Sequence, residues 1–315
     1  MIRTMLIGGL AVLPQDGSAV YRDVTATHLP AAPELHALDG VFVDVDGDGD
    51  LDLALAVEGD VNRLYMNEGS GRFSWREGAF GTVAHDTEHV RTADFDGDGH
   101  ADLVFVAEDD QTHQLFLGRG DGTFIDASDR LPSRSEGNGL AVGDVNGDGW
   151  PDIVIGSSGG GDGGGQELLW LNDTARPGWF VDATATNLPV VDDDTQDIVL
   201  ADLDGDGDLD MVVANERPRP RLLINDWTGR FSDGTDRLDL SVAIHSREVH
   251  VFDADGDRRP DILFLQELKC RTEEFPALEF EGTGYRVHAV GQTGGRNGVA
   301  VLARIPFEVV AESLP

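Results

Sequence analysis

Five nine-residue stretches combine carboxylates and glycines in a pattern that suits a hard metal ion. The first, Asp44–Asp52, reads Asp-Val-Asp-Gly-Asp-Gly-Asp-Leu-Asp, and related stretches begin at Asp94, Asp144, Asp202 and Asp253. Carboxylates at positions 1, 3, 5 and 9, with a backbone carbonyl at position 7, bring several oxygens to one point, and glycines at positions 4 and 6 permit the tight turn. This oxygen-only set favours calcium over magnesium, which needs a stricter octahedron, and over zinc, which prefers nitrogen or sulfur.

An EF-hand loop and an ordinary polar turn also combine aspartates with glycines. An EF-hand requires a bidentate Glu at position 12, where the first copy has Leu55, so that class is excluded. Asp-Gly runs also form hairpin turns, but a turn alone does not need oxygens at the same offsets in five copies. The copies differ, because Asn146 replaces a carboxylate at position 3 and Arg258 replaces a glycine at position 6. The fifth site is therefore expected to be the weakest.

The candidate calcium ligands occupy positions 1, 3, 5, 7 and 9 of each stretch, with position 7 acting through its backbone carbonyl. They are Asp44, Asp46, Asp48, Asp50, Asp52, Asp94, Asp96, Asp98, His100, Asp102, Asp144, Asn146, Asp148, Trp150, Asp152, Asp202, Asp204, Asp206, Asp208, Asp210, Asp253, Asp255, Asp257, Arg259 and Asp261. We expect them to bind four or five calcium ions, one for each stretch that keeps its ligands.

The stretches recur at spacings of 50, 50, 58 and 51 residues, so they mark an internal repeat. One apolar strand precedes each stretch and a second follows it, as at Val41–Val43 and Leu53–Val57. A third apolar run and, after a glycine-rich turn, a fourth that begins with an aromatic residue complete the unit, as at Leu168–Leu171 and Phe180–Asp182. Four short strands per unit are typical of β-propeller blades. We predict an all-β protein, a propeller-like array of four to five four-stranded blades.

From about Tyr21 to Leu265 the chain resembles the FG-GAP or VCBS repeats of integrin alpha-like propellers and of many secreted bacterial proteins. The resemblance rests on the Asp-x-Asp-Gly-Asp-Gly-x-x-Asp signature and on the Asn-x-Gly-x-Gly-x-Phe turn at Asn67–Phe73. It implies one calcium ion in each blade. Tyr21–Thr25 resembles the fourth strand of a blade whose other strands lie elsewhere in the chain, which would close the ring. Because the family commonly has six or seven blades, the roughly four and a half repeats here leave an incomplete ring as the alternative.

The repeat frame is lost after Leu265, and the segment 260–315 follows a different pattern. Pro260–Cys270 and later landmarks such as Asn297–Leu302 resemble, over about 55 residues, an early part of the exonuclease III family of DNA-repair nucleases. In that family the Glu of Leu-Gln-Glu-x-Lys, here Glu267, binds the catalytic magnesium. The strand that carries the family's first Asn is missing, and its later Asp, Asn and His would lie beyond Pro315. We expect a short α/β-type appendage without activity, which would need magnesium only if the fragment functions.

Composition restricts the partners and the compartment. The chain has 315 residues and a net charge of −36, which argues against nucleic acid as a partner of the repeats because phosphate binding needs Lys and Arg. No stretch approaches the ~20 apolar residues of a membrane span. Arg3, the apolar run Met5–Leu13 and the small residues Gly17–Ala19 predict a signal peptide over residues 1–19 and a secreted or periplasmic protein. If the run is instead a buried strand, the protein is cytoplasmic, and the single cysteine, Cys270, does not decide.

Two short motifs imitate catalytic signatures. His85–His89 fits the His-x-x-Glu-His string of some metalloproteases, and Gly156–Gly160 fits the Gly-x-Ser-x-Gly of hydrolases. The first lies in a segment that leads into a repeat and has no helical period, and the second follows a strand without opening a helix. We therefore expect neither to be catalytic, and we interpret the two histidines as solvated or interface residues.

The function favoured by these patterns is a binding or adhesion module without catalysis, with a protein or carbohydrate ligand at one face of the propeller. A fold does not specify its ligand, so this prediction concerns the class of partner only. The alternatives are a nuclease activity inherited from the C-terminal segment, and a lyase or hydrolase site built on the propeller. An incomplete ring would also expose sheet edges and favour association with another chain.

Overall fold

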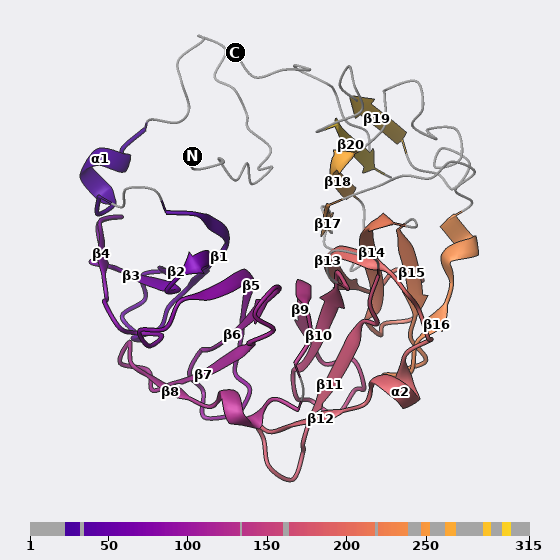
Figure 1. Ribbon diagram of the computed structural model, residues 1–315, viewed down its shortest axis with the longest axis horizontal. Coiled ribbons are helices and arrows are strands. Elements are labelled where there is room, and N and C mark those ends of the chain that lie inside the picture. Colours follow the sequence, from indigo (N-terminus) through magenta and orange to yellow (C-terminus); the bar gives the residue numbers. More distant parts are fainter. Residues whose placement is uncertain are drawn as a thin grey trace.

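The computed structural model describes residues 23–31, 35–132, 134–159, 164–217, 220–238, 247–252, 262–268, 286–290 and 298–303. Its strands form antiparallel four-stranded units that stand side by side around a common centre (Figure 1), and strand pairing joins the first two units into one eight-stranded sheet. The first strand of each sheet lies nearest the centre and the fourth lies at the periphery. The predicted all-β, propeller-like architecture is thereby confirmed, and we call each repeat a blade.

Four blades follow the predicted order of strands. Blade 1 contains β1 (Ala37–Val43), β2 (Asp52–Asp60), β3 (Arg63–Asn67) and β4 (Phe73–Trp75). Blade 2 contains β5 (His85–Ala93), β6 (Asp102–Ala107), β7 (Gln114–Gly118) and β8 (Phe124–Asp126). Blade 3 contains β9 (Gly137–Gly143), β10 (Asp152–Ser157), β11 (Leu168–Asn172) and β12 (Phe180–Asp182). Blade 4 contains β13 (Asp194–Ala201), β14 (Asp210–Arg217), β15 (Arg221–Ile224) and β16 (Ser232–Asp233).

A fifth sheet joins the last repeat to the C-terminal segment. It contains β17 (Glu248–Phe252), β18 (Ile262–Leu268), β19 (Arg286–Val290) and β20 (Gly298–Ala303). Its strand order is β17-β18-β20-β19, whereas blades 3 and 4 pair their strands in simple sequence order. The nuclease-like segment 260–315 therefore contributes three strands, β18, β19 and β20, to a sheet that begins with β17 of the last repeat.

Short helical turns follow the outer strands of blades 2 to 4, and one more precedes β1. They are α1 (Thr25–His28), α2 (Thr184–Asn187), η1 (Ser128–Arg130) and η2 (Thr235–Leu238). The Asp23 side chain accepts the Thr25 amide at 2.9 Å before α1, as Asp182 accepts that of Thr184 before α2. The residues around α1 thus have the geometry that follows a fourth strand, while Tyr21, where that strand was predicted, lies outside the described residues.

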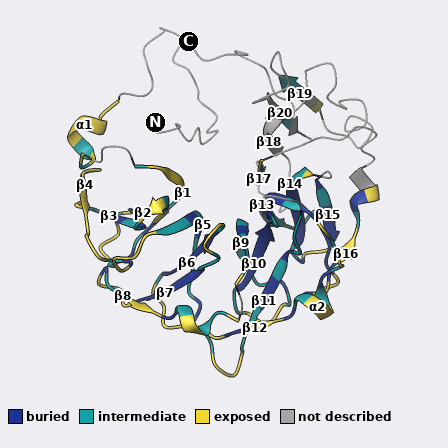
Figure 2. Ribbon diagram, in the orientation of Figure 1, coloured by how far each residue is buried: buried dark blue, intermediate teal, exposed yellow. Residues whose placement is uncertain are grey.

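The core lies between blades rather than within them. One cluster of buried residues joins blades 1 and 2, a second joins blades 2 and 3, and a third joins blades 3 and 4. Every residue of β6 and β10 is buried, as expected for strands covered on both faces. Figure 2 shows buried residues concentrated in the middle strands and exposed residues on the helical turns and outer strands. Face-to-face stacking of blades is therefore what fixes the position of each nonapeptide.

The first two strands of each blade form a hairpin with two distinct ends. We call the end that carries the nonapeptide the loop end. At the other end, which we call the bulge end, the first strand has one extra residue opposite its partner. The extra residues in blades 1 to 4 are Leu38, Glu88, Asn138 and Gln196. Such bulges redirect side chains and recur next to functional sites.

Candidate functional site

The carboxylate at position 1 organises each loop. Asp44 accepts the amide of Gly47 at 2.7 Å through one oxygen and that of Gly49 at 3.0 Å through the other. Asp94 accepts the equivalent two amides at 2.7 and 2.9 Å. The backbone therefore wraps around this carboxylate and holds it at the centre of the turn.

The glycines at positions 4 and 6 are required by backbone conformation. In the four described loops their φ angles lie between 71° and 101°, a region that other L-residues rarely adopt. The prediction that glycine permits the tight turn is thus in accord with the structure. Arg258, which replaces one of these glycines in the fifth stretch, lies outside the described residues, as do Asp253, Asp255, Asp257, Arg259 and Asp261.

Carboxylate oxygens converge in three of the loops. One oxygen from each of three residues lies within 4.8 Å of the others in the following groups: Asp44, Asp46 and Asp48; Asp94, Asp96 and Asp102; Asp202, Asp204 and Asp206. An ion 2.3–2.6 Å from each oxygen can bridge such a separation. In the third loop position 3 is Asn146, whose amide oxygen accepts the Asp148 amide at 2.9 Å. The donor sets of the first, second and fourth loops thus fit a calcium ion.

Position 9 has a structural role that the sequence analysis did not foresee. Asp152 is fully buried and accepts the amides of Val145 at 3.1 Å and Asn172 at 2.8 Å. Asp102 makes the same two kinds of bond, and burial raises the pKa of each of these two carboxyls to about 7. The position 9 carboxylate ties the loop to the end of the third strand, and Asp102 also belongs to a converging group.

Position 7 contributes contacts between loops besides its predicted carbonyl. The Trp150 ring lies against Gly97 of the preceding loop, where an added Cβ would come within 2.7 Å of the ring. Asp208 is buried and accepts the Trp227 amide at 2.6 Å, and burial raises its pKa to about 6. Side chains at this position therefore stabilise the loops.

Hydrogen bonds from asparagines connect the second and third loops to the blade that follows each of them. The side-chain amide of Asn172 in blade 3 donates to the Phe95 carbonyl of the second loop at 2.9 Å. Asn225 in blade 4 donates in the same way to the Val145 carbonyl of the third loop at 2.7 Å. The sequence shows that third strands end at Asn, but it does not show that the partner belongs to another blade.

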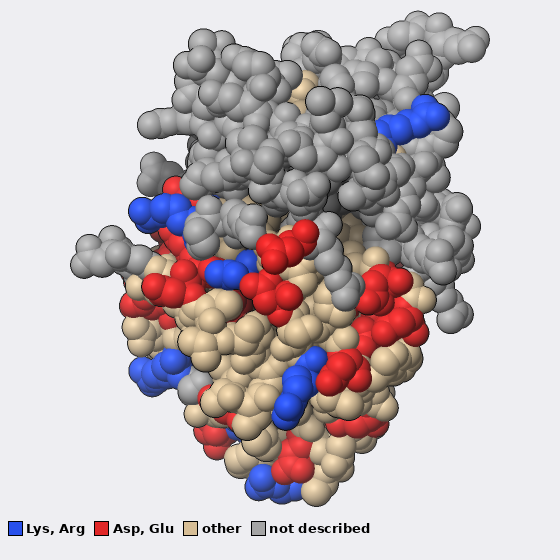
Figure 3. All heavy atoms as spheres, turned by 90° about the vertical axis from the view of Figure 1, so that its right-hand side faces the viewer, with Lys and Arg blue, Asp and Glu red and all other residues tan. Residues whose placement is uncertain are grey.

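Few cations lie near the loops. No carboxylate at position 1, 3 or 5 of the first three loops pairs with an arginine that the structure describes. Figure 3 shows acidic residues spread over the blade surface with few basic residues between them. The charge that accumulates in these loops is therefore available to a bound cation.

A second polar cluster lies between the inner strands. Asp39 of β1 accepts the Val90 amide of β5 at 3.2 Å and also contacts the His89 ring at 3.2 Å and the Arg91 guanidinium at 2.5 Å. Burial opposes ionisation of Asp39, but these partners hold its pKa well below the usual range. The equivalent Asp197 accepts the Val249 amide at 3.1 Å. These aspartates join neighbouring inner strands and identify His89 as an interface residue.

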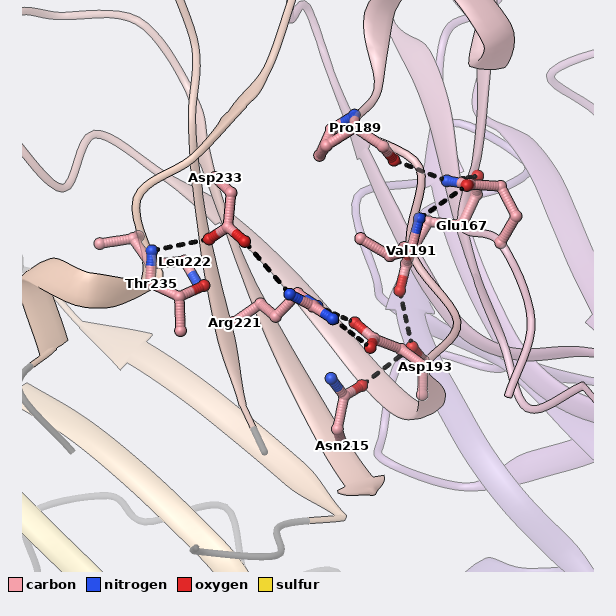
Figure 4. A network of polar contacts seen from close by, with 11 residues as sticks. Glu167, Pro189, Val191, Asp193, Asn215, Arg221, Leu222, Asp233 and Thr235 are labelled. Atoms are coloured by element: carbon pink, nitrogen blue, oxygen red, sulfur yellow. Dashed lines mark hydrogen bonds and ion pairs between the residues drawn. The ribbon is translucent and has the colours of Figure 1, made fainter. Parts of the chain in front are cut away.

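At the bulge end of blade 4, arginines neutralise the acidic side chains. Figure 4 shows Arg221 between Asp193, which it contacts through two nitrogens, and Asp233, 3.2 Å away. Nearby, the buried Glu167 accepts the Thr195 hydroxyl at 2.9 Å, while its second oxygen has no partner among the described residues. Burial and the charge of Asp193 raise the pKa of Glu167 to about 7.

The nuclease-like segment contributes no described catalytic side chain. Glu267, the predicted magnesium ligand, lies in β18, and its side chain is outside the described residues. His85–His89 lies in β5, so the expectation that this string is not a metalloprotease helix is confirmed. The described α-helices, α1 and α2, have four residues each, and none is long enough to cross a membrane.

Two family models match the chain. The model described as FG-GAP-like repeat matches residues 44–105, 104–155 and 202–264, which together include all five nonapeptides. The model of the Endonuclease/Exonuclease/phosphatase family matches residues 246–313. Both resemblances inferred from the sequence are thereby confirmed. No curated protein matches this chain at a significant level.

Several solved structures are similar at low sequence identity. The Vibrio cholerae biofilm matrix protein Bap1 is 19% identical over 74% of this chain, with a TM-score of 0.41, and the chain spans only 35% of that protein. BBS1N in complex with ARL6DN is 12% identical over 89% of this chain and 96% of its own, with a TM-score of 0.45. An exo-beta-1,3-galactanase described from Bifidobacterium bifidum s17 is 9% identical over 87% of this chain and 92% of its own, with a TM-score of 0.42. We draw no functional inference from similarity at this level.

Proposed function

Because the chain belongs to the FG-GAP-like repeat family, we propose that it is a secreted, calcium-binding propeller module that binds a protein or carbohydrate without catalysis. The observation that carries this proposal is the convergence of carboxylate oxygens within 4.8 Å in three loops of matching sequence. Calcium accepts six to eight oxygen ligands in flexible geometry, which suits loops whose donors are side chains and a backbone carbonyl.

Calcium binding would have two consequences for the fold. It would neutralise carboxylates that lack arginine partners in the first three loops, and it would tie positions 1, 3 and 5 to one point. Because Asn172 and Asn225 link the second and third loops to the following blades, fixing either loop also fixes the next blade. We therefore assign calcium a structural role. Calcium modules with millimolar affinity are typical outside the cell, which supports export.

Exposed aromatic residues support the choice of ligand class. Trp75, Trp179 and Trp227 are 38%, 37% and 52% exposed. Trp179 lies between two guanidinium groups, those of Arg130 and Arg176, at 5.4 and 5.2 Å from its ring. Tryptophan and arginine are enriched in protein interfaces, and aromatic rings have a flat apolar face for a partner. These side chains are the first to test for contact with a protein or carbohydrate.

The proposal is tested by calcium titration and thermal unfolding of the full chain, with a chelator control. We expect the nonapeptides to bind four or five ions per chain and the melting temperature to rise with calcium, since each site filled at 100 times its Kd adds about 2.7 kcal/mol. An unfolding transition that does not respond to calcium would contradict the proposal. Cleavage of abasic DNA in magnesium by the same sample would instead favour the nuclease alternative suggested by residues 246–313.

A further inference from the structure

We propose that the bulge end of blade 2 is a second type of divalent-cation site, formed by Asp86, Glu88 and Glu108 and separate from the nonapeptide loops. The site takes a hard cation of the calcium class. It lies at the opposite end of the hairpin β5–β6 from the second loop, so its ligands are independent of the repeat signature.

The three carboxylates come together because of strand pairing and the bulge. One oxygen from each lies within 4.8 Å of the other two, and all three side chains are half-buried. The Glu108 amide donates to the Asp86 carbonyl at 3.0 Å, which places these residues opposite each other where β6 ends. Glu88 is the extra residue of the bulge, and the bulge brings its carboxylate to the same point.

A buried hydroxyl from blade 3 points to the same place. Ser158 is 5% exposed, and its hydroxyl is directed at Glu108 without forming a hydrogen bond of good geometry. It lies beside the Glu108 carboxyl, where it partly offsets the rise in pKa that burial causes. Asn138, the bulge residue of blade 3, contacts Glu108 at 3.5 Å through its side-chain amide. A cation here would bind the lone pairs of the Ser158 oxygen, which accept no hydrogen bond from the described residues.

The corresponding positions in blade 4 differ in how their acidic residues are paired. Counting from the start of each nonapeptide, the equivalents of Asp86, Glu88 and Glu108 are Asp194, Gln196 and Glu216 in blade 4. There Arg217 pairs with Asp194 at 3.2 Å, and Arg247 pairs with Glu216 at 2.8 Å.

In blade 2 no described arginine pairs with Asp86, Glu88 or Glu108. Three carboxyl groups that converge in a half-buried site are stabilised in their ionised form by a cation that binds all of them. The bulge end of blade 2 thus has one more acidic residue than the equivalent positions of blade 4 and lacks the arginine pairs described there.

The neighbouring histidines do not belong to the site. The His85 ring pairs with Asp110 at 2.7 Å, and the His89 ring contacts Asp39 at 3.2 Å. The donors that remain are carboxylate, amide and hydroxyl oxygens. Such a set selects calcium or a related hard cation rather than zinc or copper.

The test compares bound calcium per chain for wild type, Glu88→Gln and Glu108→Gln by equilibrium dialysis, with Glu216→Gln as the matched control in blade 4. We expect each blade 2 variant to lose one ion, or to bind it roughly tenfold or more weakly, because each removes a charged ligand. The control should bind as many ions as wild type. Unchanged stoichiometry and affinity in both blade 2 variants would overturn the proposal.

A second measurement does not depend on the variants folding. Crystals of the wild-type chain soaked in manganese, a hard cation with a strong anomalous signal, should show a peak between Asp86, Glu88 and Glu108. A saturated soak without that peak would overturn the proposal. This result can be distinguished from the test of the nonapeptide sites. An ion that is lost only in Glu88→Gln and Glu108→Gln belongs to blade 2, whether or not the nonapeptides hold calcium.

Discussion

The loop end and the bulge end of the hairpin formed by the first two strands of each blade differ in how negative charge is compensated. At the loop end, every described blade repeats one construction, with a carboxylate at position 1 enclosed by backbone amides and a buried carboxylate at position 9. At the bulge end, the same positions vary from blade to blade. Blade 4 uses arginines to neutralise its acidic residues there, and blade 2 does not.

This difference separates what the repeat requires from what an individual blade can acquire. A loop that must hold one ion in one geometry tolerates little variation in its donors and glycines. The bulge end has no such constraint, because its extra residue changes type without disturbing the pairing of the other strand residues. Chemistry specific to this protein is therefore expected at the bulge end.

The largest expected effect is the loss of an arginine at the bulge end of blade 4. Arg221→Met should lower the free energy of unfolding by about 3–5 kcal/mol, because Asp193, which is fully buried, would keep its charge without a partner. Urea unfolding at neutral pH measures this. The matched control is Arg217→Met, since Arg217 pairs with Asp194 but its side chain is 69% exposed.

For the exposed pair we expect a change of less than about 1 kcal/mol. Equal losses in the two variants would contradict the view that burial, rather than charge pairing alone, decides which arginine matters. The comparison thus tests whether the bulge end of blade 4 is neutralised for stability.

At the loop end, the expected effect is smaller and depends on position. In chelator, Asp152→Ala should cost about 2–4 kcal/mol, because it leaves the amides of Val145 and Asn172 buried without an acceptor. Asp148→Ala changes an exposed carboxylate of the same loop and should cost less than about 1 kcal/mol. Urea unfolding in chelator and in calcium measures both variants.

In calcium, Asp148→Ala should also weaken calcium binding. The loss of stability in Asp152→Ala should persist with and without the ion. If Asp152→Ala were harmless in chelator, position 9 would be a ligand only. The pair therefore separates the anchor of the loop from its ligands.

The sequence predicted much of this fold, because the repeat is strong at every level. The spacing of the nonapeptides, the apolar strands around them and the terminal Asn of the third strands located four blades. The glycines at positions 4 and 6 were correctly attributed to the turn, since their positive φ angles follow from the geometry that the spacing requires. Local pattern and tertiary structure agree wherever a feature repeats.

Features that depend on pairing between distant residues could not be predicted. The bulge at Glu88 is defined only by its register against β6, and the Asn225 contact reaches a carbonyl 80 residues away. The structural role of position 9 could not be separated from its predicted role as a calcium ligand, because a carboxylate suits both a metal ligand and an acceptor of backbone amides. In the fifth sheet, β20 pairs with β18, an order that periodicity does not encode.

The smallest expected effect concerns a single proton at the bulge end of blade 3. The pKa of Glu167 rises from 4.5 to about 7 because the side chain is buried and Asp193 is close. Between these two values the folded protein keeps a proton that the unfolded chain releases, so stability falls as pH rises. Below about pH 4.5 both states are protonated and the effect disappears, and above about pH 7 it is constant.

Glu167→Gln removes this titration but keeps an oxygen to accept the Thr195 hydroxyl. Wild type should therefore lose stability relative to the variant as pH rises from 5 to 7. The unfolding free energy of the variant minus that of wild type should increase by at most about 1.4 kcal/mol per pH unit. Urea unfolding in chelator at several pH values measures it without interference from bound calcium. A difference that stays constant with pH would mean that Glu167 titrates normally despite its burial, and would leave Arg221 as the decisive charge at that end.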